Sequence, residues 1–182
     1  MDVTVCIATF GDPAWSVLAT RTALPSALWQ AEDPRVVMTH GETLAAARNA
    51  AAAQADTEWL IFCDADDQLA PGYITAMAAA DGDLRVPRLF LGGDEVDLTS
   101  RDIEATNPCP VGTAIRKEVL LDCGGWPTFR AWEDWALFLR AARRGASIVH
   151  TEAVYRAGYD PAGRNSTVWG PRQLHEEIRA WA

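Results

Sequence analysis

The sequence predicts an α/β fold with a mostly parallel central sheet that is flanked by helices. Its first half alternates short buried strands with helical stretches, a pattern that is typical of parallel sheets. Its 182 residues are 49% hydrophobic, which is enough for one well-formed core. No internal repeat, low-complexity tract or linker divides the chain, so we expect one domain over residues 1–182.

Local patterns predict most of the elements. Continuous apolar or β-branched runs indicate buried strands, and we expect these at residues 3–9, 36–39, 59–63, 84–91, 111–115 and 148–155. Helix propensity, caps and apolar periodicity predict helices, which we place at residues 15–29, 44–55, 71–80, 117–122, 133–144 and 171–181. We expect Pro25 to interrupt the first helix and Pro87 to mark an edge strand or a bulge.

The remaining stretches lack apolar periodicity and are expected to be loops. They are residues 40–42, 92–110 and 160–168. The terminal helix is expected to place Leu174, Ile178 and Trp181 on one face.

The charge balance excludes one class of partner. The formal net charge is −9 and the sequence pI is about 4.7, whereas a DNA or RNA binder needs a cationic surface to neutralise phosphates. Binding of a single nucleotide is still compatible with this charge, because a divalent metal can bring the opposite charge.

The four cysteines and the N-terminus indicate a cytoplasmic protein. Cys6, Cys63, Cys109 and Cys123 form no C-x-x-C pair, so we expect reduced structural thiols. The chain begins without a basic segment followed by an apolar one, and no apolar run of membrane-spanning length occurs. We therefore expect neither a signal peptide nor a transmembrane helix.

Three aspartates follow the expected strand at 59–63 directly, at positions 64, 66 and 67. Residues two apart in an extended chain point the same way, so Asp64 and Asp66 can aim two carboxylates at one point. The carboxyl edge of a parallel sheet is where open α/β folds bind ligands, and clustered carboxylates repel unless a cation lies among them. Oxygen ligands suit Mg²⁺ or Mn²⁺ bridged to phosphates. The alternative is an acidic turn that caps the next helix.

Two further polar features have both an ordinary and a functional interpretation. Arg48 and Asn49 lie on a helix shortly before the acidic strand; Arg48 is either an exposed arginine or a clamp for phosphates. Glu133 and Asp134 begin a later helix, where acidic residues also occur simply because the helix dipole stabilises them.

Taken in order, these segments resemble glycosyltransferase family 2. The strand at 3–9 is similar to the opening strand of the family, and Ala47-Arg48-Asn49 matches its A-R-N helix. The apolar strand that ends in Asp64-Ala65-Asp66-Asp67 matches its D-x-D-D. Gly124-Gly125-Trp126, Glu133-Asp134-Trp135 and Tyr155-Arg156 match its later blocks. The matching blocks span residues 3 to about 166, nearly the whole chain.

The resemblance implies a GT-A fold and transfer of a sugar from a nucleotide-diphosphate sugar to an acceptor hydroxyl. Residues 1–91 would form the nucleotide-binding half, and residues 92–182 the acceptor half, with the loop at 92–110 over the active site. The implied cofactor is Mn²⁺ or Mg²⁺. We expect a UDP-sugar donor, with GDP- and dTDP-sugars as alternatives. The acceptor is an unidentified glycan, lipid, small molecule or protein.

The resemblance also assigns residues. Asp66 would bind the metal directly, while Asp64 would hold the ribose or a metal-bound water. Asp67 would lie behind these two residues without contacting the metal itself. Asp134 is the expected general base, with Glu133 as the second choice, and one base fits single displacement with inversion. The expected contacts to the nucleotide-sugar are Thr9, Phe10, His40, Glu42, Arg48, Asp64, Ala65, Arg156 and Arg164.

The chain departs from the family pattern at two places. Thr39-His40-Gly41-Glu42 stands where many relatives have D-D-G-S, which contacts the base. Gly158 stands where relatives often have a histidine, so the third metal contact is either lost or supplied by Asp160.

Other interpretations stay open at this stage. Aspartyl phosphohydrolases also carry D-x-D, but after the first strand and with a lysine near the phosphate, whereas the sole lysine here, Lys117, has no such context. A GT-A-like protein that binds a nucleotide or glycan without turnover is the other alternative. Trp126 and Trp132 could line a sugar pocket or fill the core, whereas Trp135 is expected in the core.

Overall fold

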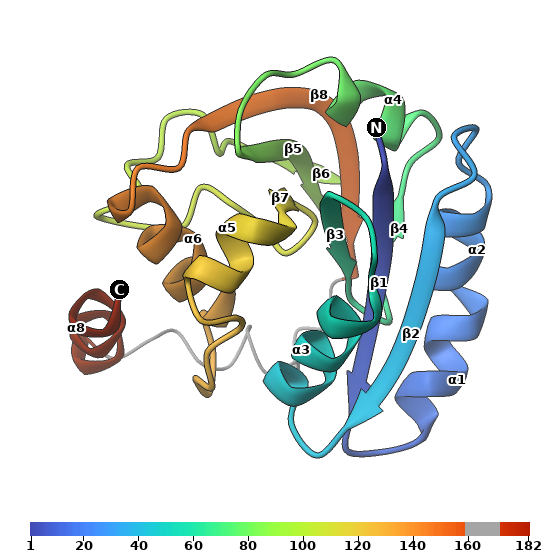
Figure 1. Ribbon diagram of the computed structural model, residues 1–182, viewed down its shortest axis with the longest axis horizontal. Coiled ribbons are helices and arrows are strands. Elements are labelled where there is room, and N and C mark those ends of the chain that lie inside the picture. The colour runs from blue at the N-terminus through green and yellow to red at the C-terminus, as the bar shows by residue number, and fades with distance from the viewer. Residues whose placement is uncertain (159–171) are drawn as a thin grey trace.

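The computed structural model describes residues 1–158 and 172–182 (Figure 1). An eight-stranded sheet forms its centre, in the order β2-β1-β3-β7-β5-β8-β4, with β6 paired to β5. The strands are β1 (Val3–Phe10), β2 (Arg35–Gly41), β3 (Trp59–Cys63), β4 (Gln68–Leu69), β5 (Leu84–Leu91), β6 (Asp94–Val96), β7 (Ala114–Arg116) and β8 (Ile148–Ala157).

The long strands of this sheet run in one direction. β1 is parallel to both β2 and β3, and β5 is parallel to β8. β7 lies antiparallel to β3 on one side and to β5 on the other, so β5 and β8 point the same way as the first three strands. The expected mostly parallel sheet is confirmed, and the carboxyl ends of its long strands share one edge.

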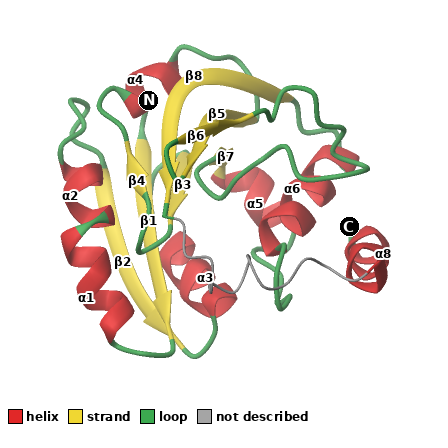
Figure 2. Ribbon diagram, turned by 180° about the vertical axis from the view of Figure 1, so that it is seen from behind, coloured by secondary structure: helices red, strands yellow, loops and turns green. Residues whose placement is uncertain are grey.

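Seven described helices pack around the sheet. They are α1 (Ala14–Arg21), α2 (Ala23–Leu28), α3 (Leu44–Gln54), α4 (Tyr73–Ala78), α5 (Lys117–Asp122), α6 (Glu133–Arg143) and α8 (Arg172–Trp181). Both views place α1 and α2 on one side of β1 and β2, and α3 on the other (Figures 1 and 2). No described helix combines the length and the apolarity that crossing a bilayer requires.

The local sequence explains α3 well. Thr43 precedes the helix with an extended backbone, and its Oγ1 accepts a hydrogen bond from the Ala46 amide at 3.1 Å. Its small buried side chains let the helix approach β1 and β2 closely, among them Ala47 and Ala51. At Gly41, an added Cβ would lie 3.0 Å from the Ala47 amide nitrogen, so this approach requires a glycine.

Several boundaries differ from the expected ones. The first helical stretch breaks at Thr22 rather than at Pro25, which lies in the first turn of α2, where its missing N–H removes no hydrogen bond. α4 starts at Tyr73 because Gly72 adopts a left-handed φ of 77°. Pro87 does mark a bulge, since the pairing of β5 with β8 shifts between Val86 and Arg88.

The second half also shows two differences. Residues 92–110 contain the short strand β6, and residues 110–113 form a turn in which the Thr113 amide donates to the Pro110 carbonyl at 2.8 Å. β7 therefore begins at Ala114, three residues later than predicted. The expected loop at 160–168 lies outside the described residues.

A second, smaller core joins the C-terminal helix to α6. Leu174 and Ile178 of α8 are buried against Trp135 and Leu139 of α6, and Trp181 packs at the edge of this cluster. The predicted apolar face of the terminal helix and the core position of Trp135 are both confirmed. All four cysteines are buried free thiols, as expected.

Candidate functional site

Several residues singled out in the sequence lie at the carboxyl edge of the sheet. Phe10, Glu42 and Asp64 lie at or just beyond the ends of β1, β2 and β3, and Gly158 follows β8. Because these strands run in the same direction, their ends meet at one edge, which is where open α/β folds bind ligands.

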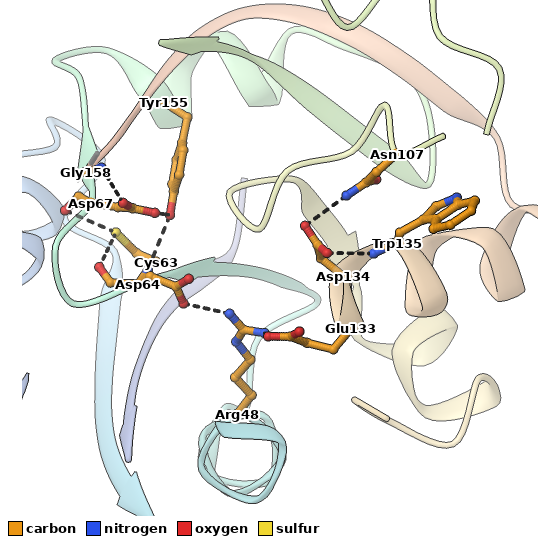
Figure 3. Close-up of polar contacts among 10 residues, drawn as sticks. All are labelled: Arg48, Cys63, Asp64, Asp67, Asn107, Glu133, Asp134, Trp135, Tyr155 and Gly158. Carbon is orange, nitrogen blue, oxygen red and sulfur yellow. Dashed lines mark hydrogen bonds and ion pairs between the residues drawn. The ribbon is translucent and has the colours of Figure 1, made fainter. Parts of the chain in front are cut away.

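Arg48 of α3 connects two acidic segments that are far apart in the sequence. Its Nη2 lies 2.7 Å from Asp64 Oδ1, and its Nη1 lies 3.2 Å from Glu133 Oε1 (Figure 3). The guanidinium is 2% exposed and stacks 4.2 Å from the centre of the Trp126 ring. Burial by itself lowers the pKa of a guanidinium, but Asp64 and Glu133 outweigh it and raise the pKa of Arg48. The arginine is thus fully charged and held by carboxylates.

Asp134 lies beside this ion pair, in the first turn of α6. Its Oδ2 accepts a hydrogen bond from Asn107 Nδ2 at 2.9 Å, and its Oδ1 accepts one from the Trp135 amide at 2.8 Å (Figure 3). Burial and then the charge of Glu133 raise the pKa of Asp134 to about 7. A half-buried carboxylate that titrates near neutral pH is suited to accept a proton.

Asp67 is enclosed more tightly than the other acidic residues after β3. It is 6% exposed, and its Oδ2 accepts a hydrogen bond from the Tyr155 hydroxyl at 2.5 Å. Its Oδ1 accepts one from the Gly158 amide at 2.8 Å. Burial and then the charge of Asp64 raise its pKa to about 8. Asp67 therefore fastens the end of β8 to the acidic turn.

Gly158 approaches Asp66 closely. A Cβ added at this glycine would lie 2.8 Å from Asp66 Oδ2 and 2.9 Å from the Asp66 carbonyl oxygen. A side chain at position 158 therefore requires the acidic turn to move, so the glycine is part of the packing of that turn. Asp160, which is one of the two alternatives for the third metal contact, lies outside the described residues.

The residues expected to hold a metal lie at the end of β3 and are half-buried. Asp64 gives one oxygen to Arg48, and its other oxygen accepts no hydrogen bond from the part of the chain that the structure describes. Within residues 1–158 and 172–182, no cluster of three or more acidic, histidine or cysteine side chains has metal-binding geometry. A cation there would have to complete its coordination with substrate oxygens and water, as Mg²⁺ commonly does.

A pocket of about 180 Å³ opens beside Glu133 at the start of α3. Its lining includes Phe10 and Glu42, two of the expected donor contacts, and Phe129 from the segment before α6. Two other expected contacts touch each other next to it, since Thr9 Oγ1 lies 3.0 Å from His40 Nδ1.

The other expected donor contacts lie in different surroundings. Ala65 is buried at 5% exposure in the acidic turn, and Arg156 is exposed on β8 opposite Gln68 of β4. Arg164 lies outside the described residues. Trp126 belongs to the core, with its ring edge-on to Phe62 at 4.9 Å between ring centres.

Two residues that the structure places at this site are not predicted by the sequence patterns. The sequence indicates Tyr155 only as part of a motif, whereas in the structure its hydroxyl also accepts a hydrogen bond from the Asp64 amide at 3.3 Å. Asn107 lies in the stretch expected to be a loop, and the only sequence signal for a role is that it is an asparagine in an irregular stretch.

The family follows from a comparison with known sequences. The model of the family described as glycosyl transferase family 2 matches residues 27–143, which is more than half of the chain. The chain belongs to glycosyl transferase family 2. The matched region of this family 2 domain includes α3, the acidic turn after β3, and α6, so it contains Arg48, Asp64 and Asp134. No curated protein matches the sequence.

Crystal structures of S. aureus TarS share the fold. The complex of S. aureus TarS 1-349 with UDP-GlcNAc has a TM-score of 0.70 at 18% identity, over 98% of this chain and 64% of that one. S. aureus TarS has a TM-score of 0.66 at 20% identity, over 88% of this chain and 37% of that one. The complex of TarS 1-349 with UDP has a TM-score of 0.59 at 18% identity, over 88% and 61%. The family 2 domain thus spans less than two thirds of these chains, and at such identities the likeness establishes the fold.

Proposed function

We propose that this family 2 domain transfers a sugar from a UDP-sugar to an acceptor hydroxyl, with a divalent cation and with inversion at the sugar carbon. The observation that carries the proposal is the bridge through Arg48. It joins the acidic turn after β3 to the start of α6, so a site for the diphosphate and a proton acceptor lie next to each other.

The donor set fits Mn²⁺ or Mg²⁺. Asp64 and Asp66 offer only oxygen ligands, are half-buried, and lie at the edge where the strands end. Oxygen ligands with room for water and phosphate are what these two cations prefer. When bound, the cation would stabilise the negative charge that develops on the leaving nucleoside diphosphate.

The pocket beside α3 supports binding of the nucleotide at the same edge. Phe10 and Phe129 provide apolar surface, and Glu42 and Glu133 provide acceptors for hydroxyl or ring N–H groups. The TarS complexes hold UDP-GlcNAc and UDP on the same fold, which favours a UDP-sugar over the GDP- and dTDP-sugars that the sequence leaves open.

Asp134 is the proposed general base. Its raised pKa allows it to accept the acceptor's proton near neutral pH as the hydroxyl attacks the sugar carbon. Glu133 is a poorer candidate, because it is 6% exposed and already paired with Arg48. A single base acting on the side opposite the leaving group corresponds to single displacement, and therefore to inversion.

Ligand-induced stabilisation tests the donor and the cation together. We expect UDP and UDP-GlcNAc to raise Tm in the presence of MnCl₂ or MgCl₂, with a smaller rise for GDP and dTDP and none in EDTA. Asp66→Asn should remove the cation-dependent part of this rise, whereas Asp94→Asn, at an exposed aspartate of β6, should not.

Release of UDP from UDP-GlcNAc then separates a catalyst from a binder. Slow hydrolysis of the donor with MnCl₂ supports the transferase, because water can replace the acceptor. A wild-type protein that binds UDP-GlcNAc but releases no UDP, with or without candidate acceptors, would instead be a nucleotide-sugar-binding protein. Absence of any Tm shift with every nucleotide would contradict the whole proposal.

A further inference from the structure

Asn107 contacts Asp134 from the segment between β6 and β7. The asparagine is 6% exposed, and its Nδ2 donates to Asp134 Oδ2 at 2.9 Å. Its Oδ1 accepts from the Cys109 amide at 2.9 Å. A backbone amide can only donate and an ionised carboxylate can only accept, so the two contacts together define which way the side-chain amide points. Its N–H group is therefore directed at Asp134.

We propose that Asn107 is a positioning residue for Asp134, which orients the carboxylate and favours its ionised form. The functional meaning of this inference rests on the proposed role of Asp134 as the general base. The hydrogen bond and its effect on the carboxylate do not depend on that role and can be measured separately.

The segment that carries Asn107 is fastened to the helix that carries Asp134. Trp135 Nε1 donates to the Ile103 carbonyl at 2.7 Å, and Arg143 holds Glu104 through two hydrogen bonds of 2.9 and 2.7 Å. Trp135 and Arg143, which hold the segment, thus belong to the same helix α6 as Asp134. Arg101 stiffens the segment from within, since its Nη1 donates to the Asn107 carbonyl at 2.8 Å. Contacts on both sides of the hydrogen bond between Asn107 and Asp134 therefore fix the positions of the two residues relative to each other.

The hydrogen bond leaves Asp134 able to accept a proton. An ionised carboxylate has about four lone-pair sites. Asn107 and the Trp135 amide each use one, on different oxygens. The carboxylate is therefore fixed in orientation while each oxygen keeps a further lone pair for a substrate hydroxyl.

Several charged or titratable groups face Asp134 from the surrounding elements. They are Glu133 on the same helix, Arg48 from α3, Asp64 from the turn after β3, and Cys109 from the segment that carries Asn107. Burial, Glu133 and Asp64 raise the pKa of Asp134, whereas the Trp135 amide and Arg48 lower it. The hydrogen bond that Asn107 donates also lowers the pKa of Asp134, because it stabilises the ionised form. Loss of Asn107 should therefore raise the pKa further and leave less carboxylate at neutral pH.

Titration of the Asp134 carboxyl carbon by ¹³C NMR tests the inference without any substrate. The resonance is assigned as the one missing in Asp134→Asn. In Asn107→Ala we expect its pKa to rise by about one unit, from the strength of a hydrogen bond to a charged group. Arg101→Ala loosens the same segment but keeps the donor, so its Asp134 should titrate as in the wild type. A change of equal size in Arg101→Ala would reduce Asn107 to a structural role.

Asn107→Asp provides a second test in case the alanine variant does not fold. It keeps an oxygen for the Cys109 amide but replaces the donor with a second carboxyl group. Two carboxyl groups at this distance share a proton, so Asp134 should titrate in two coupled steps, one of them well above the wild-type value. The proposal is overturned if Asp134 titrates as in the wild type in whichever of the two Asn107 variants fold.

A kinetic measurement connects the inference to function. In Asn107→Ala with UDP-GlcNAc and MnCl₂, the acidic limb of UDP release should move to higher pH, while KM for the donor stays unchanged. An equal loss of the UDP-release rate at every pH would indicate damage to the fold and contradict a positioning role. If the wild type releases no UDP, the proposed function fails for this donor, and the NMR titration still decides the role of Asn107.

Discussion

The acidic turn after β3 and the acidic start of α6 have similar parts but different surroundings. Each gives one carboxylate to Arg48, namely Asp64 and Glu133. Each also has a neighbouring carboxyl group with a raised pKa, about 8 at Asp67 and about 7 at Asp134. Asp67 is 6% exposed and hydrogen-bonded to Tyr155, whereas Asp134 is a partly exposed residue. A raised pKa therefore does not by itself mark a proton acceptor; accessibility separates the two.

The largest effect is expected from Asp134→Asn. The amide cannot accept a proton, so turnover of UDP-GlcNAc should fall by about 100- to 10,000-fold. Binding of UDP with MnCl₂, measured by calorimetry, should stay within about twofold because the amide preserves the shape of the side chain. Unchanged turnover would remove Asp134 as the base and weaken the contrast with Asp67.

Arg48→Met tests the element that both acidic segments share. Removal of the guanidinium leaves the carboxylates of Asp64 and Glu133 without their cation, which should cost about 3–5 kcal/mol of unfolding free energy. Urea unfolding at pH 7 measures this. The matched control is Arg35→Met, whose ion pair with Asp56 is exposed and should be worth less than about 1 kcal/mol. Equal losses of unfolding free energy in the two variants would show that the Arg48 bridge contributes little to stability.

The pH dependence of stability sharpens the comparison. Folded Asp134 keeps its proton up to about pH 7, whereas the unfolded chain releases it near pH 4, so the folded state binds more protons between these values. Stability should therefore fall as pH rises from 5 to 8, and Asp67 acts in the same direction. Asp134→Asn should reduce this fall by at most about 3 kcal/mol in urea unfolding. A steeper fall in the variant would contradict the raised pKa.

The smallest expected effect concerns Tyr155→Phe. The variant takes the hydroxyl from both Asp67 and the Asp64 amide, which should cost about 1–3 kcal/mol. Tyr73→Phe is the matched control, because among the described residues that buried hydroxyl makes one hydrogen bond, to the Gly112 carbonyl. Thermal unfolding of the two variants measures the difference. A larger loss for Tyr73→Phe would argue against Tyr155 as the fastening of the acidic turn.

The sequence predicted the elements that short-range patterns determine. β3 and α5 have the predicted bounds, and α3 and α6 differ from prediction by one residue at their ends. These segments have a continuous apolar run or strong helix propensity with clear caps, so neighbouring residues suffice to define them. β4 and β6 were missed because strands of two and three residues exist only through pairing with β8 and β5.

The site was predicted less completely, because its contacts join distant parts of the chain. Arg48 was expected at phosphates, yet its two Nη atoms hold carboxylates that are 16 and 85 residues away. Neither partner can be identified from periodicity. Asn107 lies in a stretch without a regular pattern, so its contact with Asp134 follows only from how that segment packs on α6. The assignments of the metal ligands and of the donor contacts stay predictions.

The contact between Gly158 and Asp66 limits how this chain can change. A histidine introduced at 158, the residue that relatives often carry there, would have its Cβ 2.8 Å from a carboxylate oxygen of Asp66. This substitution alone would displace Asp66, the expected metal ligand that the histidine would complement. Only a paired change that also reshapes the turn would be tolerated, so variants at 158 and 66 should show strong epistasis, and a library built on these two positions should yield active proteins in combinations rather than singly.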